Sequence, residues 1–444
     1  MTARRNGQIR RGRVLVRSAE PPKPVVAVLR GEREVLVQFD EPIEPDGFDV
    51  RTIGGPKVAD WRLQDERSLL LILREPPEAE FALELEGILD RAQRPNRMPR
   101  QKLIIRPTTW PRTQEGLLFA WQTGDQPNQV PDPETGGLKA FPIKPRGRAH
   151  LNHDFAMRLA YGAYLVEGAD EWLLRRLKAT HQLTLEALVW PDHLENSGPA
   201  RIVTFSSDPG SRNFTLGQEK NRLIFRLRTP QTGPNGTNPE ITLGPVSDRM
   251  PTHVVITYRP GKLIAYFNGE KVLESEQVQG DFSNWERHHF LFGDEWSGQR
   301  DWHGTLEGVA LFDRVLSAEE VRAEYEAYRK ILLSRPIIPQ IEVEAELIAA
   351  SRIPTLQEIS PYREALVVNE YRVLKAFFGD PRLERIRVVH WALMDGQTLE
   401  VPQRPGQRVR LRLEPYEQNR QLEGFYTSDT LELDFDAPLF YALP

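Results

Sequence analysis

The chain has 444 residues, of which 27% are charged and 39% hydrophobic, and it carries a formal net charge of -5 at pH 7. This balance excludes a general attraction to nucleic acid or anionic membranes, and the absence of an apolar run of about 18 residues excludes membrane insertion by a helix. The sequence contains no cysteine, which rules out disulfides and thiolate sites, while its 36 prolines, 31 glycines and short β-branched runs favour an all-β protein of several domains.

Residues 1–20 are rich in arginine and contain only one short apolar run, Val14-Leu15-Val16. A signal peptide needs an apolar region of about 7 residues or more, so this segment does not fit one. We predict a disordered basic tail, and two alternatives remain open, an arm that binds nucleic acid or another polyanion and the remnant of a longer precursor. The arginines are Arg4, Arg5, Arg10, Arg11, Arg13 and Arg17.

Residues 21–107 alternate apolar and polar side chains, as the half-buried strands of a sandwich do. The alternating apolar positions are Val35, Val37, Phe39, Phe81, Leu83 and Leu85. The segment resembles the bacterial immunoglobulin-like domain of surface-layer proteins, a family whose modules space or present other domains. The residues that match its signature are Phe39, Asp40, Glu41, Pro42, Ile43, Pro45, Gly87, Ile88, Asp90 and Asn96.

A linker is predicted at Pro107–Pro111, because residues before proline avoid the α region. Beyond it, several β-rich runs are interrupted by loops at 207–212 and 229–240. The second loop, TPQTGPNGTNPE, consists of turn formers and includes Asn235. Its length favours a binding loop with Asn235 as a ligand contact, and a solvated hairpin tip remains the alternative.

Residues 252–275 carry two runs rich in Val, Ile, Tyr and Phe around Arg259-Pro260-Gly261, and the second run ends in Asn268-Gly269. An Asn-Gly pair supplies the positive φ angles of a tight hairpin, so the pattern predicts a meander of antiparallel strands. Further on, Ser317 is a good N-cap and Glu320 completes a capping box. A short helix is therefore expected to close this segment.

The same segment resembles the laminin G-like domain of the concanavalin A-like class, which implies a jelly roll over residues 108–333. The matching strand positions are His253, Val255, Thr257, Tyr258, Leu263, Ala265, Phe267, Asn268 and Gly269. The matching closing positions are Gly304, Leu306, Glu307, Val309, Leu311, Phe312, Val315, Leu316, Ser317, Glu319, Glu320 and Val321. The family often has an acidic pair where this chain has Glu307-Gly308, and this departure weakens a calcium site placed there.

A second linker is predicted at Ser334–Pro339, followed by a C-terminal domain over residues 334–444. About five strands are expected in it, a count typical of a small closed β-barrel, and an OB-like architecture is our hypothesis from the strand number alone. The predicted architecture is thus an immunoglobulin-like sandwich, a central jelly roll and a C-terminal barrel.

Tryptophans provide the candidate binding site. Trp285, Trp296 and Trp302 lie close together among polar residues that include Arg287 and Asp294. Aromatic faces stack on sugar rings while carboxylates and amides bind the hydroxyls, so these residues are predicted ligand contacts. The alternative is that the tryptophans only seal the rim of the core.

Metal binding is predicted to be weak or absent. Asp294 and Asp301, together with loop carbonyls, are candidate calcium ligands, although two carboxylates are few for this ion. Histidines cluster only at His150/His153/Asp154 and at His288/His289, and structural or surface roles are expected for both clusters. No other cofactor is predicted.

No catalytic residue is predicted. The E-x-D-x-x-E pattern of glycoside hydrolases in this fold class is absent from the jelly roll. The nearest approach is Glu432, Asp434 and Asp436 near the C-terminus, which an acidic solvent-facing strand explains.

Two functional hypotheses follow. The first is a non-catalytic binding protein of the bacterial envelope or exterior, whose jelly roll recognises a glycan or a partner protein. The alternative is a structural or accessory subunit of a surface filament or polysaccharide-modifying assembly, in contact with other surface proteins. An exposed tryptophan in a groove favours the first, and a flat apolar patch favours the second. Neither requires nucleic acid or membrane insertion.

Overall fold

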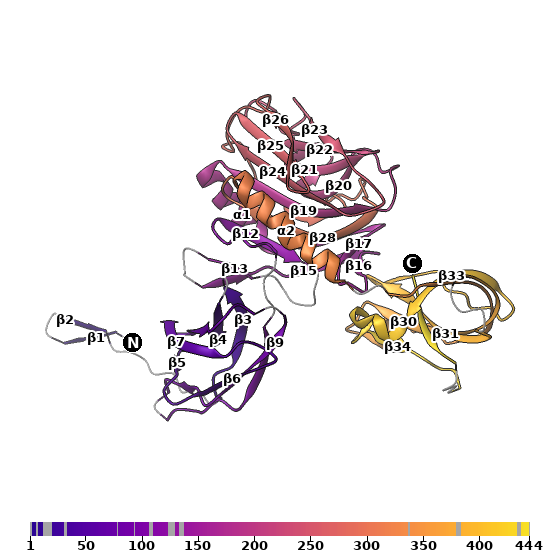
Figure 1. The fold of residues 1–444 in the computed structure, drawn as a ribbon, viewed down its shortest axis with the longest axis horizontal. Coiled ribbons are helices and arrows are strands. Elements are labelled where there is room, and N and C mark those ends of the chain that lie inside the picture. Colours follow the sequence, from indigo (N-terminus) through magenta and orange to yellow (C-terminus); the bar gives the residue numbers. More distant parts are fainter. Residues whose placement is uncertain are drawn as a thin grey trace. The chain divides into compact units, whose positions relative to one another are not determined.

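The computed structural model describes residues 2–5, 8–11, 20–30, 33–77, 79–92, 94–105, 110–122, 129–132, 137–335, 338–378, 383–432 and 437–443. The chain forms two compact units. Unit 1 comprises Met1–Gln114 and Asp132–Gly137, and unit 2 comprises Glu115–Pro131 and Leu138–Pro444. Strands dominate both units, which confirms the all-β class (Figure 1). The three-domain division stays a prediction, and residues 107–109 and 336–337 of the two predicted linkers lie outside the described residues.

Unit 1 contains two antiparallel sheets, with strand orders β3-β4-β8-β7 and β11-β9-β6, and a short β5–β10 pair. Their bounds are β3 (Pro24–Arg30), β4 (Glu34–Phe39), β5 (Ile43–Glu44), β6 (Asp49–Ile53), β7 (Val58–Asp65), β8 (Ser68–Leu73), β9 (Phe81–Glu86), β10 (Leu89–Asp90) and β11 (Gln101–Ile105). Val35, Val37, Leu83 and Leu85 share one core, as their alternation predicted. The immunoglobulin-like resemblance itself stays a prediction.

The N-terminal segment was predicted to be a disordered tail. Within it, β1 (Thr2–Arg5) and β2 (Gln8–Arg11) pair antiparallel. Residues 12–19, which include Arg13 and Arg17, lie outside the described residues. The roles proposed for this tail therefore remain predictions.

The larger part of unit 2 is a sandwich of two antiparallel sheets. The first, which we call the β28 sheet, contains β12 (Leu117–Gln122), β16 (His150–Leu151), β17 (Met157–Leu159), β19 (Leu183–Pro191), β24 (Thr252–Arg259), β25 (Lys262–Phe267), β26 (Glu270–Ser275) and β28 (Gly304–Phe312). The second, the β27 sheet, contains β15 (Ile143–Gly147), β18 (Gly162–Val166), β20 (Ala200–Asp208), β21 (Ser211–Glu219), β22 (Arg222–Leu227), β23 (Ile241–Pro245) and β27 (His289–Phe292). Phe119 of β12 contacts Phe290 and Phe292 of β27, at ring centroid distances of 5.2 and 5.9 Å, so the aromatic core lies between the sheets.

The predicted hairpin and capping box are both confirmed. Asn268 and Gly269 have φ angles of 52° and 80° between β25 and β26, as the Asn-Gly pair required. Ser317 Oγ accepts from the Glu320 N–H at 3.2 Å, and the Glu320 carboxylate accepts from the Ser317 N–H at 2.7 Å. These bonds start α2 (Ala318–Ser334), which lies across the outer face of the β28 sheet (Figure 1), where Tyr325 stacks on His253 of β24.

Shorter elements complete the sandwich. They are α1 (Ala169–Thr180) and a ribbon of β13 (Gln129–Pro131) with β14 (Leu138–Ala140). Among the described residues, no helix combines the length and the apolar character needed to cross a bilayer.

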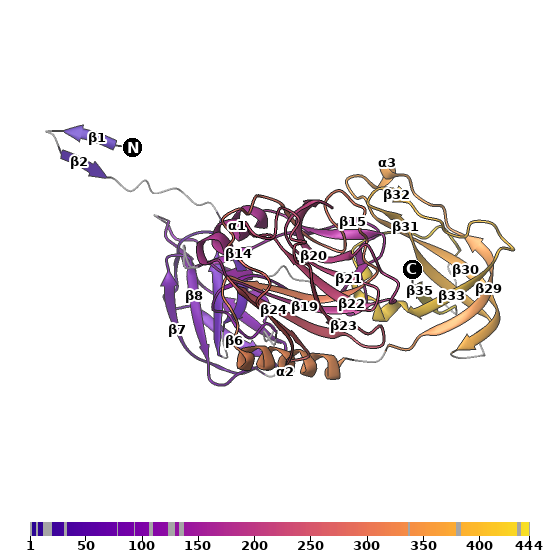
Figure 2. The same ribbon diagram turned by 90° about the horizontal axis from the view of Figure 1, so that it is seen from above.

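The C-terminal part of unit 2 is a closed barrel, as the strand count predicted (Figure 2). Its five strands are β29 (Ile341–Ala350), β30 (Ala365–Phe378), β31 (Arg385–Met394), β33 (Arg408–Pro415) and β35 (Leu439–Ala442). β29 pairs with β30 and β33, β30 pairs with β31, and β35 closes the ring between β31 and β33. Additional elements are α3 (Leu356–Ile359), β32 (Gln397–Thr398), η1 (Tyr416–Gln418), η2 (Arg420–Leu422) and β34 (Tyr426–Ser428).

The last strand begins later than the sequence predicted. Its structural bounds are Leu439–Ala442, and Glu432 lies outside any strand. Asp434 and Asp436, the other two members of the predicted acidic face, lie outside the described residues. Two of the three residues of the predicted acidic strand face are thus not described, and the third, Glu432, is not in a strand.

Candidate functional site: a cleft between sandwich and barrel

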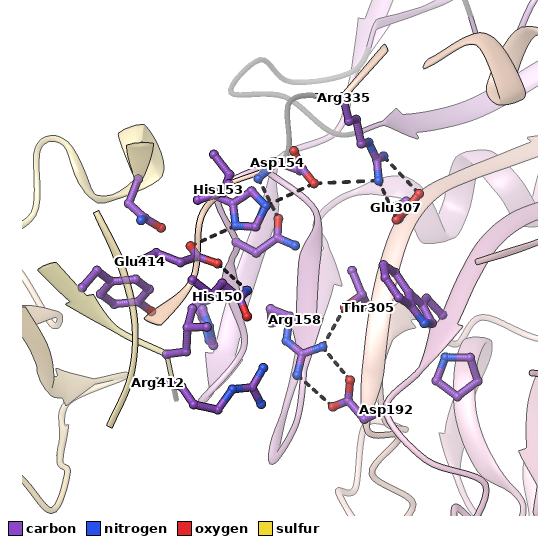
Figure 3. Close-up of a pocket in the computed structure, with 18 of the residues that line it drawn as sticks. His150, His153, Asp154, Arg158, Asp192, Thr305, Glu307, Arg335, Arg412 and Glu414 are labelled. Carbon is purple, nitrogen blue, oxygen red and sulfur yellow. Dashed lines mark hydrogen bonds and ion pairs between the residues drawn. The ribbon is translucent and has the colours of Figure 1, made fainter. Parts of the chain in front are cut away.

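A cleft of about 790 Å³ lies within unit 2 between the sandwich and the barrel, and we call it the sandwich–barrel cleft (Figure 3). The sandwich contributes side chains from β16, β17, β19, β28 and the end of α2. The barrel contributes side chains from β33, β35 and the segment between them. A volume of several hundred Å³ with mixed polar and aromatic walls is typical of a small-molecule or saccharide site.

Strand register places three functional side chains side by side on the sandwich wall. Arg158 of β17 is opposite Thr305 of β28, and Thr305 is opposite Trp190 of β19. Residues that are directly opposite one another project to the same face of a sheet. The three side chains therefore form a continuous row, and all three line the cleft.

Arg158 is held rigidly in this row. Its two terminal nitrogens donate to the two carboxylate oxygens of Asp192 at 2.7 and 2.8 Å. One of them also donates to the Thr305 hydroxyl at 2.7 Å (Figure 3). A two-point guanidinium–carboxylate contact fixes the orientation of both partners, so this wall is preorganised.

Trp190 offers a free aromatic surface at the edge of the row. The side chain is 37% exposed, and its indole N–H donates to the Asp248 carbonyl at 3.0 Å. Among the described residues, no ring or cation is stacked on it. The ring is thus fixed at one edge and open on its surface, as an aromatic platform for a ligand should be.

Arg412 reaches the cleft from the barrel, and it has no charged partner among the residues that the structure describes. Its cross-strand neighbour on β29 is Glu342, but Glu342 accepts a hydrogen bond from Arg410 at 2.6 Å. Figure 3 shows the Arg412 side chain directed toward Arg158 across the cleft. Neither Arg412 nor the exposed Asp248 carboxylate forms an ion pair with a described residue.

The opposite end of the cleft is closed by a buried charge network. Arg335, which follows α2, donates to both carboxylate oxygens of Glu307 at 2.8 and 3.0 Å. The Tyr328 hydroxyl donates to the same carboxylate at 2.6 Å. Glu307, which matches the family pattern while Gly308 replaces the second acid, therefore anchors α2 to the β28 sheet.

His153 joins the sandwich to the barrel. Its ring nitrogens lie 3.4 Å from the Asp154 carboxylate and 3.0 Å from the Glu414 carboxylate of β33 (Figure 3). Burial lowers the pKa of His153, but the hydrogen bonds and charges of these two carboxylates outweigh it and raise the pKa to about 9. The imidazolium in turn helps to lower the pKa values of Asp154 and Glu414, against the opposing effect of burial.

This bridge predicts a specific pH dependence of stability. A histidine whose folded pKa is raised stabilises the fold fully below its unfolded value near 6.5, and this contribution is lost as pH rises toward about 9. The Asp154 and Glu414 carboxylates, whose pKa values are lowered in the folded state, stabilise the fold above their unfolded pKa values. This stabilisation is lost as the pH falls through their folded pKa values. We expect up to about 3 kcal/mol of stability to disappear between pH 6.5 and 9, measured by urea unfolding of the full chain.

The matched control is His153→Gln, which keeps a polar side chain and removes the titration. Its unfolding midpoint should vary less than that of the native chain between pH 6.5 and 9. Parallel pH profiles for the two proteins would show that the bridge does not stabilise unit 2.

Two of the predicted ligand contacts are buried in the sandwich. Trp285 is 2% exposed, stacks on Phe282 at a centroid distance of 4.1 Å, and donates from its indole N–H to the Arg228 carbonyl at 2.7 Å. Trp302 is fully buried and donates to the side chain of Gln218 at 2.7 Å. Both tryptophans pack the core, which is the alternative that the sequence left open.

The third tryptophan, Trp296, is 38% exposed, but its ring is already occupied. His289 of β27 stacks on it at a centroid distance of 3.8 Å, and the Arg146 guanidinium lies over it at 4.4 Å. Arg287 is exposed and paired with Asp170 of α1. Asn235 lies in the 229–240 loop, and no described contact joins it or Arg287 to Trp296. Their role as ligand contacts remains a prediction.

Asp294 and Asp301 do lie together, but the pair does not fit a calcium site. One oxygen of Asp294 already accepts the backbone N–H groups of Glu295, Gln299 and Arg300, which closes the loop. Partial desolvation and then the nearby Asp294 carboxylate raise the pKa of Asp301 to about 6. Calcium prefers six to eight oxygens, and among the described residues no group of three or more acidic or histidine side chains is arranged to hold a metal ion.

The sequence did not identify the side chains that line the sandwich–barrel cleft, except for the His150/His153/Asp154 cluster. Trp190 lies between Val189 and Pro191 in an apolar run, with no motif around it that marks a binding residue. Arg158 and Arg412 occur in strand-like segments with no motif around them. Only strand pairing over long sequence separations brings them together.

Residues 170–322 match a laminin G model described as the concanavalin A-like lectin/glucanases superfamily. This match confirms the resemblance stated for the central segment. Among curated proteins, no sequence matches the chain significantly.

Solved structures show weaker similarity. The binding domain of botulinum neurotoxin serotype D/C is 12% identical, with 67% of this chain and 73% of that chain covered and a TM-score of 0.37. Domain 4 of AbnA, an extracellular arabinanase from Geobacillus stearothermophilus solved with arabinotriose, is 14% identical, with 48% of this chain and 100% of that chain covered and a TM-score of 0.34. Scores at this level establish neither a common overall fold nor a common ligand.

Proposed function

With a laminin G-like domain at residues 170–322 as the premise, we propose that this chain is a non-catalytic binding protein whose sandwich–barrel cleft binds a glycan. The observation that supports the proposal most directly is the free, fixed indole of Trp190 at the edge of this cleft. Sugar rings present an apolar face of C–H groups to such a surface. The proposal moves the binding site away from Trp285 and Trp302, which are buried.

Recognition of the sugar hydroxyls would come from two charged groups that form no ion pair with a described residue. The Asp248 carboxylate accepts hydrogen bonds and the Arg412 guanidinium donates them, so together they suit the hydroxyl groups of a sugar. Arg158 and Asp192 hold each other in place and form a rigid wall beside them. A binding site built from preorganised groups loses little entropy when the ligand enters.

The other charged groups of the cleft support binding rather than catalysis. Glu307 and Glu414 are engaged by Arg335 and His153, and Asp192 is engaged by Arg158. A glycosidase needs one carboxyl group that can donate a proton and a second that can attack or activate water. We place such a glycan-binding protein in the cell envelope or outside the cell.

The test is binding of the full chain to a glycan array, followed by calorimetric titration of the strongest ligand. Trp190→Ala should weaken binding by about 1 to 3 kcal/mol, the contribution of one aromatic anchor. Trp296→Ala is the matched control, since it removes a similarly exposed tryptophan whose ring already carries His289 and Arg146. Its affinity should stay close to that of the native chain.

Two results would contradict the proposal. If no glycan binds, the alternative of a structural or accessory subunit gains support, and cross-linking to other surface proteins becomes the informative experiment. If Trp296→Ala abolishes binding while Trp190→Ala does not, the ligand lies on the 294–301 loop and not in the sandwich–barrel cleft.

A further inference from the structure

A second cavity, of about 370 Å³, lies between the sandwich and the barrel of unit 2 and shares His150 with the first. Its walls are largely apolar and include Tyr164 of β18, Trp391 of β31 and Phe425. The Trp391 and Phe425 rings meet edge to face at a centroid distance of 4.9 Å, and Phe425 is 37% exposed. We call this cavity the acceptor pocket, because its lining residues include the hydrogen-bond acceptors of Gln421 and His150.

Gln421 lines this pocket and carries a hydrogen-bond acceptor that has no partner among the described residues. The side chain is 92% buried, since only 8% of it is exposed. Its amide nitrogen donates to Asn419 at 2.8 Å, while its amide oxygen is buried and has no partner among the described residues. An unpaired buried acceptor costs about 1 to 3 kcal/mol, so the site favours a ligand that brings an N–H or O–H donor.

His150 adds a second acceptor. Its Nδ1 lies 3.0 Å from the Arg148 carbonyl oxygen, which can only accept a hydrogen bond. The proton of the neutral ring is therefore on Nδ1, and Nε2 is unprotonated and can accept a hydrogen bond. Burial lowers the pKa of His150 to about 4, which keeps the ring neutral at physiological pH. His150, which lines the pocket, therefore carries a ring-nitrogen lone pair and no positive charge.

The charged groups of the pocket are both acidic. The Asp395 carboxylate already accepts hydrogen bonds from the Gly147 N–H, at 3.1 Å, and from the exposed Arg363 guanidinium. Glu364 has no ion-pair or hydrogen-bond partner among the described residues. No lysine or arginine is among the described residues that line the pocket.

We propose that the acceptor pocket binds a primary alkylammonium group, supplied by a lysine side chain or by a small free amine. The ammonium has three N–H donors and no acceptor, which suits Gln421 and His150, and its charge is balanced by Glu364. The aromatic walls of Trp391 and Phe425 attract a cation and bury the alkyl stem. A quaternary ammonium group has no N–H donor, and a neutral alcohol has no positive charge, so each should bind the pocket less tightly than a primary ammonium.

Calorimetric titration of the full chain with hexylammonium, tetramethylammonium and hexanol tests this proposal. Hexylammonium should bind more tightly than either of the other two. Glu364→Gln, which keeps the shape and removes the charge, should weaken hexylammonium binding about tenfold. Gln421→Leu should weaken it as well. The control Glu400→Gln removes an exposed carboxylate of the barrel that does not line the pocket, and should have no effect.

Two further comparisons identify the source of the ammonium group and separate this site from the glycan site. One comparison uses lysine whose backbone amine and carboxyl group are blocked. If it binds more tightly than hexylammonium, the ligand is a lysine side chain, and the reverse order indicates a free amine. Trp190→Ala should leave amine binding unchanged, so failure of the glycan proposal does not affect this one. Equal binding of hexanol and hexylammonium, or an unchanged affinity in Glu364→Gln, would overturn the proposal.

Discussion

Replacing Glu295 by alanine is expected to lower the free energy of unfolding of unit 2 by about 3 to 5 kcal/mol, because it leaves buried guanidinium groups without their counter-charge. Arg201 is 1% exposed and lies 3.4 Å from the equally buried Glu295 carboxylate. Arg212 of the neighbouring strand is also fully buried. Burial lowers the pKa of Arg201 to about 10 and that of Arg212 to about 9, and the Glu295 charge opposes both shifts.

The measurement is the urea midpoint of the full chain near neutral pH. Glu240→Ala is the matched control, since Glu240 pairs with Arg226 of the same sheet at 2.6 Å but is exposed, and exposed pairs contribute little. A second variant, Glu295→Leu combined with Arg201→Met and Arg212→Met, should recover much of the lost stability by removing all three charges. If Glu295→Ala is no more destabilising than Glu240→Ala, the buried arginines do not depend on this carboxylate.

Trp302→Ala is expected to destabilise unit 2 by about 3 to 5 kcal/mol, the cost of removing a large aromatic side chain from a packed core. The ring is fully buried and packs so closely on Gly304 that a Cβ atom added there would lie 2.4 Å from it. The substitution also removes the hydrogen bond to Gln218, which is itself buried. Thermal unfolding of the variant should show a clearly lowered midpoint.

Trp296→Ala serves as the comparison for this prediction, since its side chain is 38% exposed. Its unfolding midpoint should fall much less than that of Trp302→Ala. A stably folded Trp302→Ala variant that has lost glycan binding would restore Trp302 as a ligand contact and would contradict its structural role.

The sequence by itself determined the elements whose signals are local. The two β-forming runs around Arg259-Pro260-Gly261, the Asn268-Gly269 turn and the Ser317–Glu320 capping box each involve residues a few positions apart, and all three are present in the structure. The closed five-stranded barrel also followed from strand count and spacing. The concanavalin A-like class followed from the same short-range patterns, since a family motif is a set of such patterns in a fixed order.

Tertiary structure alone decided which side chains are exposed and which meet. Trp285 and Trp302 have polar neighbours in sequence, yet they are buried, because burial depends on the layer that a loop packs against and not on the polarity of adjacent residues. The cleft combines Arg158, Trp190, Thr305 and Arg412, which come from four strands of two β-structures. Their proximity depends on pairing between strands far apart in the chain, and a single sequence contains no local signal for such pairing.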